Sequence, residues 1–465
     1  MKNYSIHETC KDSSARLQNI SIENRISSQK QPMCTIVIDE NQEHQTIEGF
    51  GGALTESSAY VLSTLPVKKR EEVINSYFGS VDGNKYTIAR SHINSCDFSL
   101  DNWSCLEKKD ETLESFSMER AAQYLIPLIK DCCSVVEKTQ SKKMMLMISP
   151  WSPPAWMKDN GSMNHGGKLL PQYKKLWASF ILRYIQKLEQ EDISVWAVSI
   201  QNEPAAVQVW DSCIWSADDE AEFACSCLGP LLEKNGKDSI KIFVWDHNRD
   251  LLLERFSQSM KHKDAQKYIA GAAYHWYSGD QYNNVNEVYK KHPDKMLIFS
   301  EGCIEGGPRN GAWFSGERYA HNIINDLNSG CSAWIDWNIV LNTQGGPNHV
   351  GNYCDAPILV DEKTHEVFYQ SSYYYLGHFS RFIEPKAKRI GCSVLTGMVP
   401  SAPDGRAGNL IESCAVKNPD GSVTVVVCNR TEEDIPYTIK NNEESIIHST
   451  LIIPPRSIQT VVIEK

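Results

Sequence analysis

The sequence predicts an α/β protein built as a (β/α)8 TIM barrel, with an accessory β-sandwich domain made from both chain termini. Two patterns predict this fold: strand-like apolar runs alternate with helical segments through the middle of the chain, and apolar and polar residues alternate in the tail. The first pattern is typical of parallel βαβ units, and the second is typical of half-buried antiparallel strands. We place the barrel at residues 45–378 and the sandwich at residues 1–44 together with residues 379–465.

Eight apolar runs are the expected barrel strands. They are Gln45–Phe50, Tyr86–Asn94, Met144–Ser149, Val195–Gln201, Ile240–Asp246, Tyr268–His275, Met296–Ser300 and Cys331–Trp337. Tyr173–Leu188 and Ala217–Leu232 lie between these runs and have the periodicity of amphipathic helices. Eight such units in about 300 residues fit a closed barrel better than a doubly wound sheet, which usually has fewer strands.

The C-terminal tail has the signals of β-hairpins. Apolar and polar residues alternate from Leu410 to Lys440 around the turn Asn418–Gly421, and the pattern returns in Ser449–Lys465. Cys34–Ile38 is a further strand-like run, which we expect to pair with the tail. All twelve tryptophans lie between Trp103 and Trp337, so both ends of the chain differ in composition from the middle.

Charge and apolar content exclude several classes of protein. The formal net charge is −11 and no basic cluster occurs, so we expect no nucleic acid partner. No apolar run approaches the roughly 20 residues of a membrane span, so we expect no integral membrane segment. Fifteen irregularly spaced cysteines and a polar N-terminus unlike a secretory signal predict a cytoplasmic protein with reduced thiols. The composition leaves the oligomeric state open.

Carboxylates, amides and indoles follow the predicted strands, at the barrel end where active sites gather. The candidates at these positions are Glu56, Arg90, Trp151, Asn202, Glu203, His275, Tyr277, Glu301 and Trp337. Such groups suit a neutral ligand rich in hydroxyls, because amides and acids bond hydroxyls and indoles pack against the C–H face of a sugar. No His/Cys cluster has zinc spacing, and Gly49–Gly52 lacks the third glycine of a dinucleotide loop, so we expect no metal and no cofactor.

Two glutamates at these strand ends have the setting of catalytic acids. Glu203 ends a strand and precedes Pro204, and Glu301 directly follows the largely apolar run Leu297–Ser300. A carboxyl group at such a boundary is desolvated on one side and open to a ligand on the other, so its pKa can be tuned for catalysis. Glycosidic bond cleavage needs such a pair, one carboxylate to attack the anomeric carbon and one acid to protonate the leaving oxygen.

The ordered motifs of the chain resemble family 30 of the glycoside hydrolases, which contains glucosylceramidases, bacterial β-1,6-glucanases and β-xylosidases. The motifs are Gly49–Glu56, Ser149–Pro154, Gln201–Pro204, Ser300–Glu301, Trp334–Asn338 and Gly345–Asn348. The resemblance implies a retaining mechanism with Glu301 as nucleophile and Glu203 as acid/base. It also implies that Asn202 bonds the sugar's 2-hydroxyl or the nucleophile, and that Arg90 steadies the charge of the nucleophile.

The resemblance further implies a subsite for the terminal sugar. Its members are Glu56, Trp151, Trp337 and Asn348, with His275 and Tyr277 nearby. Position 56 departs from the lysosomal glucosylceramidases, which carry the shorter Asp there, so their specificity is not carried over.

We therefore expect a retaining glycoside hydrolase that cleaves a β-glucoside or β-linked oligosaccharide. The two carboxyl groups should lie about 5–5.5 Å apart. Arg90 should lower the pKa of Glu301, and the charge of Glu301 should raise the pKa of Glu203. An endo-β-1,6-glucanase and a β-xylosidase stay open as alternatives, as does a non-catalytic carbohydrate-binding protein. The polar N-terminus favours exo action on small glycosides.

Overall fold

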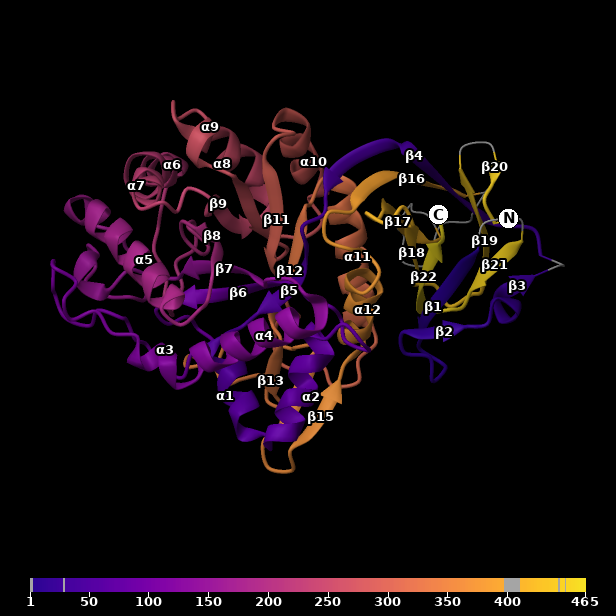
Figure 1. Cartoon of the computed structure of the whole chain (residues 1–465), viewed down its shortest axis with the longest axis horizontal. Helices are drawn as coiled ribbons and strands as arrows, with labels where there is room; N and C mark the ends of the chain where they lie inside the picture. The colour runs from indigo at the N-terminus through magenta and orange to yellow at the C-terminus, as the bar shows by residue number, and fades with distance from the viewer. Residues whose placement is uncertain (1–2, 28–29, 397–409, 442–443, 448) are drawn as a thin grey trace. The chain divides into compact units, whose positions relative to one another are not determined.

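The computed structural model describes the chain except residues 1–2, 28–29, 397–409, 442–443 and 448 (Figure 1). The described chain forms two compact units, which we treat one at a time. The barrel unit comprises residues 50–310 and 333–368, and the sheet unit comprises residues 1–49, 311–332 and 369–465.

The barrel unit contains the predicted closed barrel of parallel strands, which follow one another around the barrel in chain order. The strands are β5 (Gly49–Ala53), β6 (Ile88–Ile93), β7 (Met145–Pro150), β8 (Val195–Ser199), β9 (Lys241–Asn248), β10 (Gly271–His275), β11 (Met296–Glu301) and β12 (Ala333–Asn338). Apolar side chains from seven of these strands, among them Ile88, Phe243 and Ile298, form one buried cluster. The barrel interior is therefore a packed core, and the polar strand ends are left for a site.

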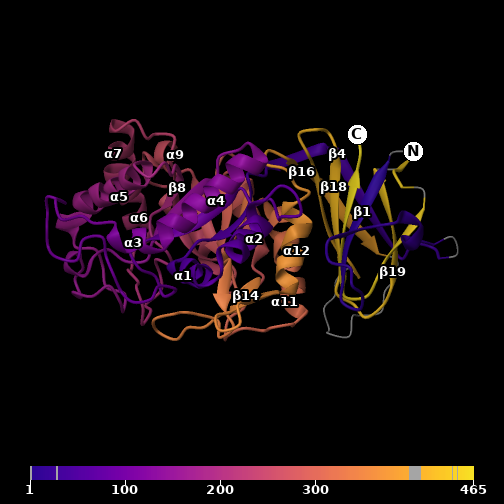
Figure 2. The same cartoon turned by 60° about the horizontal axis from the view of Figure 1, so that its bottom comes forward.

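Helices follow the barrel strands, as the sequence predicts (Figure 1). They are α1 (Glu56–Thr64), α2 (Val67–Phe78), α3 (Glu119–Gln123), α4 (Leu125–Gln140), α5 (Lys174–Glu189), α6 (Ala217–Phe223), α7 (Gly229–Lys234), α8 (Leu252–Ser259), α9 (Ala265–Tyr268) and α10 (Tyr282–Lys291), with the short turns η2 (Ala155–Met157), η3 (Pro171–Tyr173), η4 (Ala224–Leu228) and η5 (Arg249–Leu251). In Figure 2, α2 and α4 lie side by side. The segment Ala217–Leu232 is not one regular helix, because the π turn η4 separates α6 from α7.

The first barrel strand differs from its prediction. Gln45–Phe50 was expected there, but Gln45 and Thr46 end the long strand β4 (Cys34–Thr46) of the sheet unit, where Thr46 pairs with Lys388. The barrel strand β5 starts at Gly49. A Cβ atom at Gly51 would lie 1.9 Å from the carbonyl oxygen of Ile88, so glycine allows β5 to pack against β6.

The sheet unit holds an eleven-stranded, mostly antiparallel sheet that draws on both ends of the chain, and it confirms the predicted β-sandwich. Its strands are β1 (Tyr4–Cys10), β2 (Gln18–Ile20), β3 (Ile26–Ser27), β4, β16 (Lys388–Thr396), β17 (Glu412–Lys417), β18 (Val423–Asn429), β19 (Ile435–Asn441), β20 (Glu444–Ser445), β21 (Thr450–Ile453) and β22 (Ser457–Ile463). Figure 1 shows β1 from the indigo end beside β22 from the yellow end. The turn η1 (Ile22–Arg25) and the helices α11 (Phe314–Ser329) and α12 (Ser371–Ser380) complete the unit.

A small third sheet follows the last barrel strand. It contains β13 (Val340–Asn342), β14 (Ile358–Asp361) and β15 (Glu366–Tyr369). The segment between β13 and β14 carries Asn348, so this sheet anchors both ends of a loop with a predicted site residue. Within the described residues, no helix has the length and apolar character needed to span a membrane.

Candidate active site

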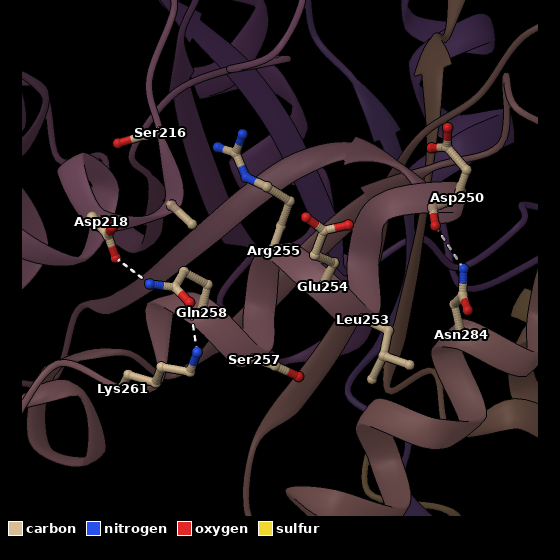
Figure 3. A pocket seen from close by; sticks show the side chains of 11 residues that line it. Ser216, Asp218, Asp250, Leu253, Glu254, Arg255, Ser257, Gln258, Lys261 and Asn284 are labelled. Atoms are coloured by element: carbon tan, nitrogen blue, oxygen red, sulfur yellow. Dashed lines mark hydrogen bonds between the residues drawn. The ribbon is translucent and has the colours of Figure 1, made fainter.

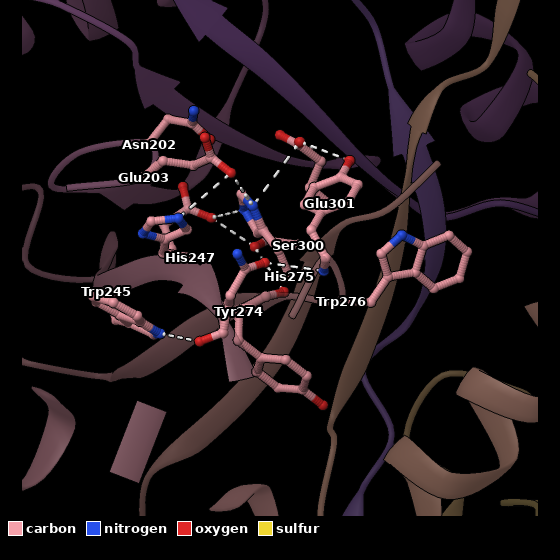
Figure 4. A network of polar contacts seen from close by, with 12 residues as sticks. Asn202, Glu203, Trp245, His247, Tyr274, His275, Trp276, Ser300 and Glu301 are labelled. Carbon is pink, nitrogen blue, oxygen red and sulfur yellow. Dashed lines mark hydrogen bonds and ion pairs between the residues drawn. The ribbon is translucent and has the colours of Figure 1, made fainter. Parts of the chain in front are cut away.

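The barrel brings Glu203 and Glu301 together. Glu301 is the last residue of β11, and Glu203 follows β8 with a positive φ of 48°, its N–H donating to the Asp246 carbonyl oxygen at 3.0 Å. One carboxylate oxygen of each glutamate and one ring nitrogen of His275 lie within 4.8 Å of one another. Figure 4 shows the imidazole of His275 facing both carboxylates.

Arg90 connects Glu301 with two other groups. Its guanidinium is fully buried, and Nη1 donates to Glu301 Oε2 at 2.6 Å. Nη2 donates to Asn202 Oδ1 and to Asp246 Oδ2, both at 2.8 Å. These contacts fix the orientation of Arg90 and leave Nη1 directed at the predicted nucleophile.

Two tryptophans cover the guanidinium of Arg90. Its central carbon lies 4.8 Å from the ring centroid of Trp151 and 5.5 Å from that of Trp337, within the range of cation–π attraction. The two indoles are buried and stack on each other with centroids 5.4 Å apart. The two indoles predicted for the site therefore form a single aromatic wall beside Arg90.

His275 and Tyr277 contact the glutamates directly. The Tyr277 hydroxyl donates to Glu301 Oε1 at 3.0 Å. His275 Nδ1 lies 3.4 Å from Glu203 Oε1 and 3.9 Å from Glu301 Oε1, and its Nε2 lies 3.1 Å from Asp246 Oδ1. His247 Nε2 lies 3.8 Å from Glu203 Oε1. Glu301 thus receives hydrogen bonds from Arg90 and Tyr277, whereas Glu203 is contacted by imidazoles.

The charges of this cluster differ from those predicted from the sequence. Burial acts to lower the pKa of His275, but the charge of Glu301 and the contacts with Asp246 and Glu203 raise it to about 9. Burial acts to raise the pKa of Glu203, but the bond and charge of His275 outweigh it, and the pKa is lowered. Burial raises the pKa of Glu301 against the opposing effects of His275 and Arg90.

Arg90 acts to lower the pKa of Glu301, as predicted, but burial outweighs it; the pKa of Glu203 is lowered, whereas the prediction was that it is raised. For Glu203 the cause is the imidazolium of His275, whose distance to that carboxylate no sequence pattern revealed, and for Glu301 the cause is burial. The imidazolium of His275 also bears on metal binding. Glu203, His275 and Glu301 are spaced closely enough to share an ion, and a metal there would have to displace the proton of His275. The chemistry of these groups fits two carboxylates around one imidazolium.

Asp97 is a site acid that the sequence analysis missed. Its Oδ2 accepts hydrogen bonds from the amides of Asn348, at 3.2 Å, and Asn352, at 3.1 Å. Burial, together with the charge of Glu301, raises the pKa of Asp97 to about 7. Asp97 lies three residues after the last predicted residue of its strand, so the rule that located the other strand-end groups could have found it.

Glu56 has a different environment from the one predicted. Its Oε2 accepts from the indole N–H of Trp103 at 2.9 Å and from the backbone N–H of Leu100 at 3.2 Å. Its Oε1 accepts from Arg120 Nε at 2.8 Å. Glu56 also opens α1, where its backbone N–H donates to His92 Nε2. Both carboxylate oxygens of Glu56 therefore serve contacts that hold a loop, and its sugar-binding role stays a prediction.

A concavity of the barrel unit lies around α8. It has a volume of about 650 Å³ and is lined by polar and charged side chains, among them Ser216, Asp218, Asp250, Arg255 and Lys261 (Figure 3). None of the predicted site residues lines this pocket. Its charges are mixed in sign, and Gln258 already bonds Asp218 and Lys261 across it.

Comparisons with known proteins agree with this geometry. The family model described as the glycosyl hydrolase family 30 TIM-barrel domain matches residues 47–383, and that of the family's beta sandwich domain matches residues 386–461. The chain is 32% identical to the lysosomal acid glucosylceramidase of Mus musculus over 444 residues, covering 91% of this chain and 82% of the relative.

Two solved structures resemble the protein over the full length of both chains. SrfJ from Salmonella typhimurium shares 33% identity with a TM-score of 0.89. The endo-beta1,6-glucanase BT3312 shares 25% identity with a TM-score of 0.85. Because both family models match in order and together span most of the sequence, the chain belongs to glycosyl hydrolase family 30 and is a glycoside hydrolase.

Proposed function

We propose that the protein hydrolyses β-glucosides with retention of configuration, with Glu301 as nucleophile and Glu203 as general acid and base. The observation that carries this proposal is the closeness of the two carboxylates: one oxygen of Glu203 lies within 4.8 Å of one oxygen of Glu301. Retaining enzymes hold their carboxyl groups about 5–5.5 Å apart, whereas inverting enzymes leave about 6.5–9.5 Å for a water molecule. The short separation supports direct attack on the anomeric carbon.

The donors around Glu301 support its role as nucleophile. Arg90 Nη1 and the Tyr277 hydroxyl occupy one oxygen each, and both favour the ionised carboxylate. Attack by Glu301 on the anomeric carbon forms a glycosyl ester and breaks the bond to the leaving oxygen, which takes a proton from Glu203. Glu203 then removes a proton from water, which attacks the ester and frees the sugar and Glu301.

The proton for the first step has a source beside Glu203. In the ligand-free arrangement the proton is on His275, whose pKa is raised to about 9 by Glu301, Asp246 and Glu203 against the effect of burial. Transfer from Nδ1 of His275 to Glu203 Oε1, 3.4 Å away, gives a neutral imidazole and a protonated Glu203 while Glu301 stays ionised. This is the distribution that the reaction requires.

The test is trapping by an activated 2-deoxy-2-fluoro β-glucoside followed by peptide mass spectrometry. We expect a covalent sugar on Glu301 and loss of trapping in Glu301→Gln. In Glu203→Gln, turnover of a substrate with a poor leaving group should fall by about 10²–10⁴-fold, and a dinitrophenyl glucoside should be trapped faster than it is released. A folded protein that is labelled by no 2-fluoro sugar and turns over no aryl glycoside would instead support a carbohydrate-binding protein.

We further propose exo action, in which one terminal glucose is released. Asp211 joins four loops beside Asp97, and we call the contacts of its side chain and backbone the Asp211 clasp. Asp211 is 1% exposed, accepts a bond from the Ser95 hydroxyl, and lies 3.3 Å from His349 Nε2. The backbone of Asp211 forms an isolated β-bridge with Asn164. The side-chain amides of Asn164 and Asn102 form two hydrogen bonds with each other.

The clasp supports a pocket rather than an open groove. Its loops follow β6, β7, β8 and β13, and the loop of His349 also contacts Asp97 through the His349 N–H. We infer that loops tied together in this way limit the room for a second sugar beyond the one that Glu301 attacks. Endo action, the activity named for BT3312, requires that room.

An aryl β-gentiobioside distinguishes the two modes. An exo enzyme should release glucose first and the aryl group afterwards, whereas an endo enzyme should release gentiobiose together with the aryl group. We expect glucose to be released before the aryl group, and we expect no cleavage of internal bonds in pustulan. Asp211→Ala should raise the share of gentiobiose. Gentiobiose as the first product of the unaltered enzyme would establish the endo alternative.

A further inference from the structure

Asp246 occupies an irregular position in β9. The pairing of β9 with β10 skips a residue there, because Ala273 lies opposite Trp245 and Tyr274 lies opposite His247. Trp245 and Asp246 have positive φ values of 75° and 45°, a conformation that residues with a Cβ atom adopt rarely. Such bulges recur beside active sites, where they redirect a side chain.

The outer side of this bulge is fixed by α6 and α8. The backbone N–H of Trp245 donates to Glu220 at 2.9 Å, and Glu220 also accepts from Arg255 at 2.8 Å. The guanidinium of Arg255 lies 4.8 Å from the ring of Trp245. The unusual backbone conformation is thus held in place by neighbouring helices.

The inner side of the bulge places the Asp246 carboxylate among donors from five other strands of the barrel. Oδ2 accepts from Arg90 Nη2 at 2.8 Å, Ser149 Oγ at 3.1 Å and Ser199 Oγ at 2.6 Å. Oδ1 accepts from Ser300 Oγ at 2.6 Å and lies 3.1 Å from His275 Nε2. The carboxylate is completely buried, so these five contacts account for its environment.

We propose that Asp246 is a positioning residue for both catalytic glutamates: one oxygen directs Arg90 at Glu301, and the other holds Nε2–H of His275 so that Nδ1 faces Glu203. The proposal rests on the proposed function, because it assigns how the two glutamates acquire different protonation states. Asp246 touches neither glutamate side chain in the described contacts, and it acts through the two cations between them.

The contacts of Asp246 make its charge necessary. All five neighbours donate, so the NH₂ of an asparagine at this position would face donors on one side and leave either Arg90 or His275 without an acceptor. The negative charge also favours protons on the cluster. The charged and titratable groups that face His275 and Asp246 are Arg90, Glu203, His247, Tyr277 and Glu301, together with Glu220 of α6 behind the bulge. Removing the negative charge of Asp246 therefore lowers the pKa of every titratable group around it.

Kinetics of Asp246→Asn over a range of pH test the proposal. We expect kcat/KM on an aryl β-glucoside to fall by about 10²–10⁴-fold, by analogy with removal of the orienting acid of a catalytic histidine. Both limbs of the pH profile should move to lower pH. Glu317→Gln is a matched control, because it also removes a buried carboxylate paired with an arginine, Arg456, but lies in the sheet unit. Limbs that stay in place in Asp246→Asn would show a merely structural role and overturn the proposal.

A measurement on the unaltered protein covers the case in which the variant does not fold. With ¹⁵N-labelled histidine, the signal lost in His275→Gln should report Nε2–H at all pH values and titrate well above pH 6.5. An Nδ1–H tautomer, or a His275 that is neutral at pH 7, would overturn the contact with Asp246. If instead no β-glycoside is turned over, the proposed function fails while this titration still decides the role of Asp246.

Discussion

At the residue scale, Asp97 and Glu56 are buried acids that follow neighbouring strands and have contrasting partners. Glu56 bonds Arg120, so its charge is balanced by a cation. Asp97 accepts from two neutral amides, and the charge of Glu301 together with burial raises its pKa to about 7. A carboxyl group that accepts only from neutral amides and lies near the proposed nucleophile is well placed to hydrogen-bond a sugar hydroxyl.

The pair gives a matched test of sugar binding. In Asp97→Asn we expect kcat/KM on an aryl β-glucoside to fall by about 10–10²-fold, because a charged hydrogen bond contributes about 1.5–3 kcal/mol. Glu56→Gln should lower the unfolding temperature through the lost Arg120 bond and change KM less than Asp97→Asn. Steady-state kinetics and thermal unfolding of both variants provide the measurement. A larger KM effect in Glu56→Gln would restore the assignment predicted from the sequence.

At the element scale, α6, β9 and α8 are joined by one buried acid. Glu220 of α6 bonds the backbone of Trp245 in β9 and the guanidinium of Arg255 in α8. Burial raises the pKa of Glu220 to about 7, although Arg255 acts to lower it. This contact fixes the bulge that carries Asp246, so an outer helix contributes to the geometry of the inner site.

Glu220 should make the free energy of unfolding fall as the pH rises. Its pKa is higher in the folded state than the value of about 4.3 in an unfolded chain, so its contribution is complete below pH 4.3 and is lost as the pH rises through 7. Glu220→Gln removes this group, and its unfolding temperature should vary less between pH 4.5 and pH 7 than that of the unaltered protein. Thermal unfolding across this range checks the prediction, and an unchanged slope would contradict it.

At the scale of the whole molecule, each compact unit is assembled from separate stretches of chain. The sheet unit combines both ends of the sequence, because β1 pairs with β22 and β4 pairs with both β16 and β19. The helices α11 and α12 join this unit by their contacts, although they follow barrel strands in the chain. A sheet of this topology cannot form from one end of the chain alone.

The local sequence determined the strands and the chemistry at their ends. Apolar runs located seven of the eight barrel strands and misplaced the first, and the alternating tail predicted β17, β18 and β22. Residue type and strand-end position selected Arg90, Glu203, His275, Tyr277 and Glu301, which the structure brings into contact. The apolar pattern and the residue types at strand ends are both local signals. Buried positions recur with the period of a strand or a helix, so they can be located within a short stretch of sequence.

Only the tertiary structure decided how these groups are charged and held. The contact of His275 with Glu203 lowers the pKa of Glu203, and burial raises the pKa of Glu301 against the effect of His275. Both effects depend on how three different strands meet in the barrel. The Asp246 bulge, the site position of Asp97 and the Asp211 clasp arise in the same way, from register and from loops that meet across the barrel. Electrostatic interactions depend on separation in space and on burial, and neither quantity is written in the order of residues along the chain.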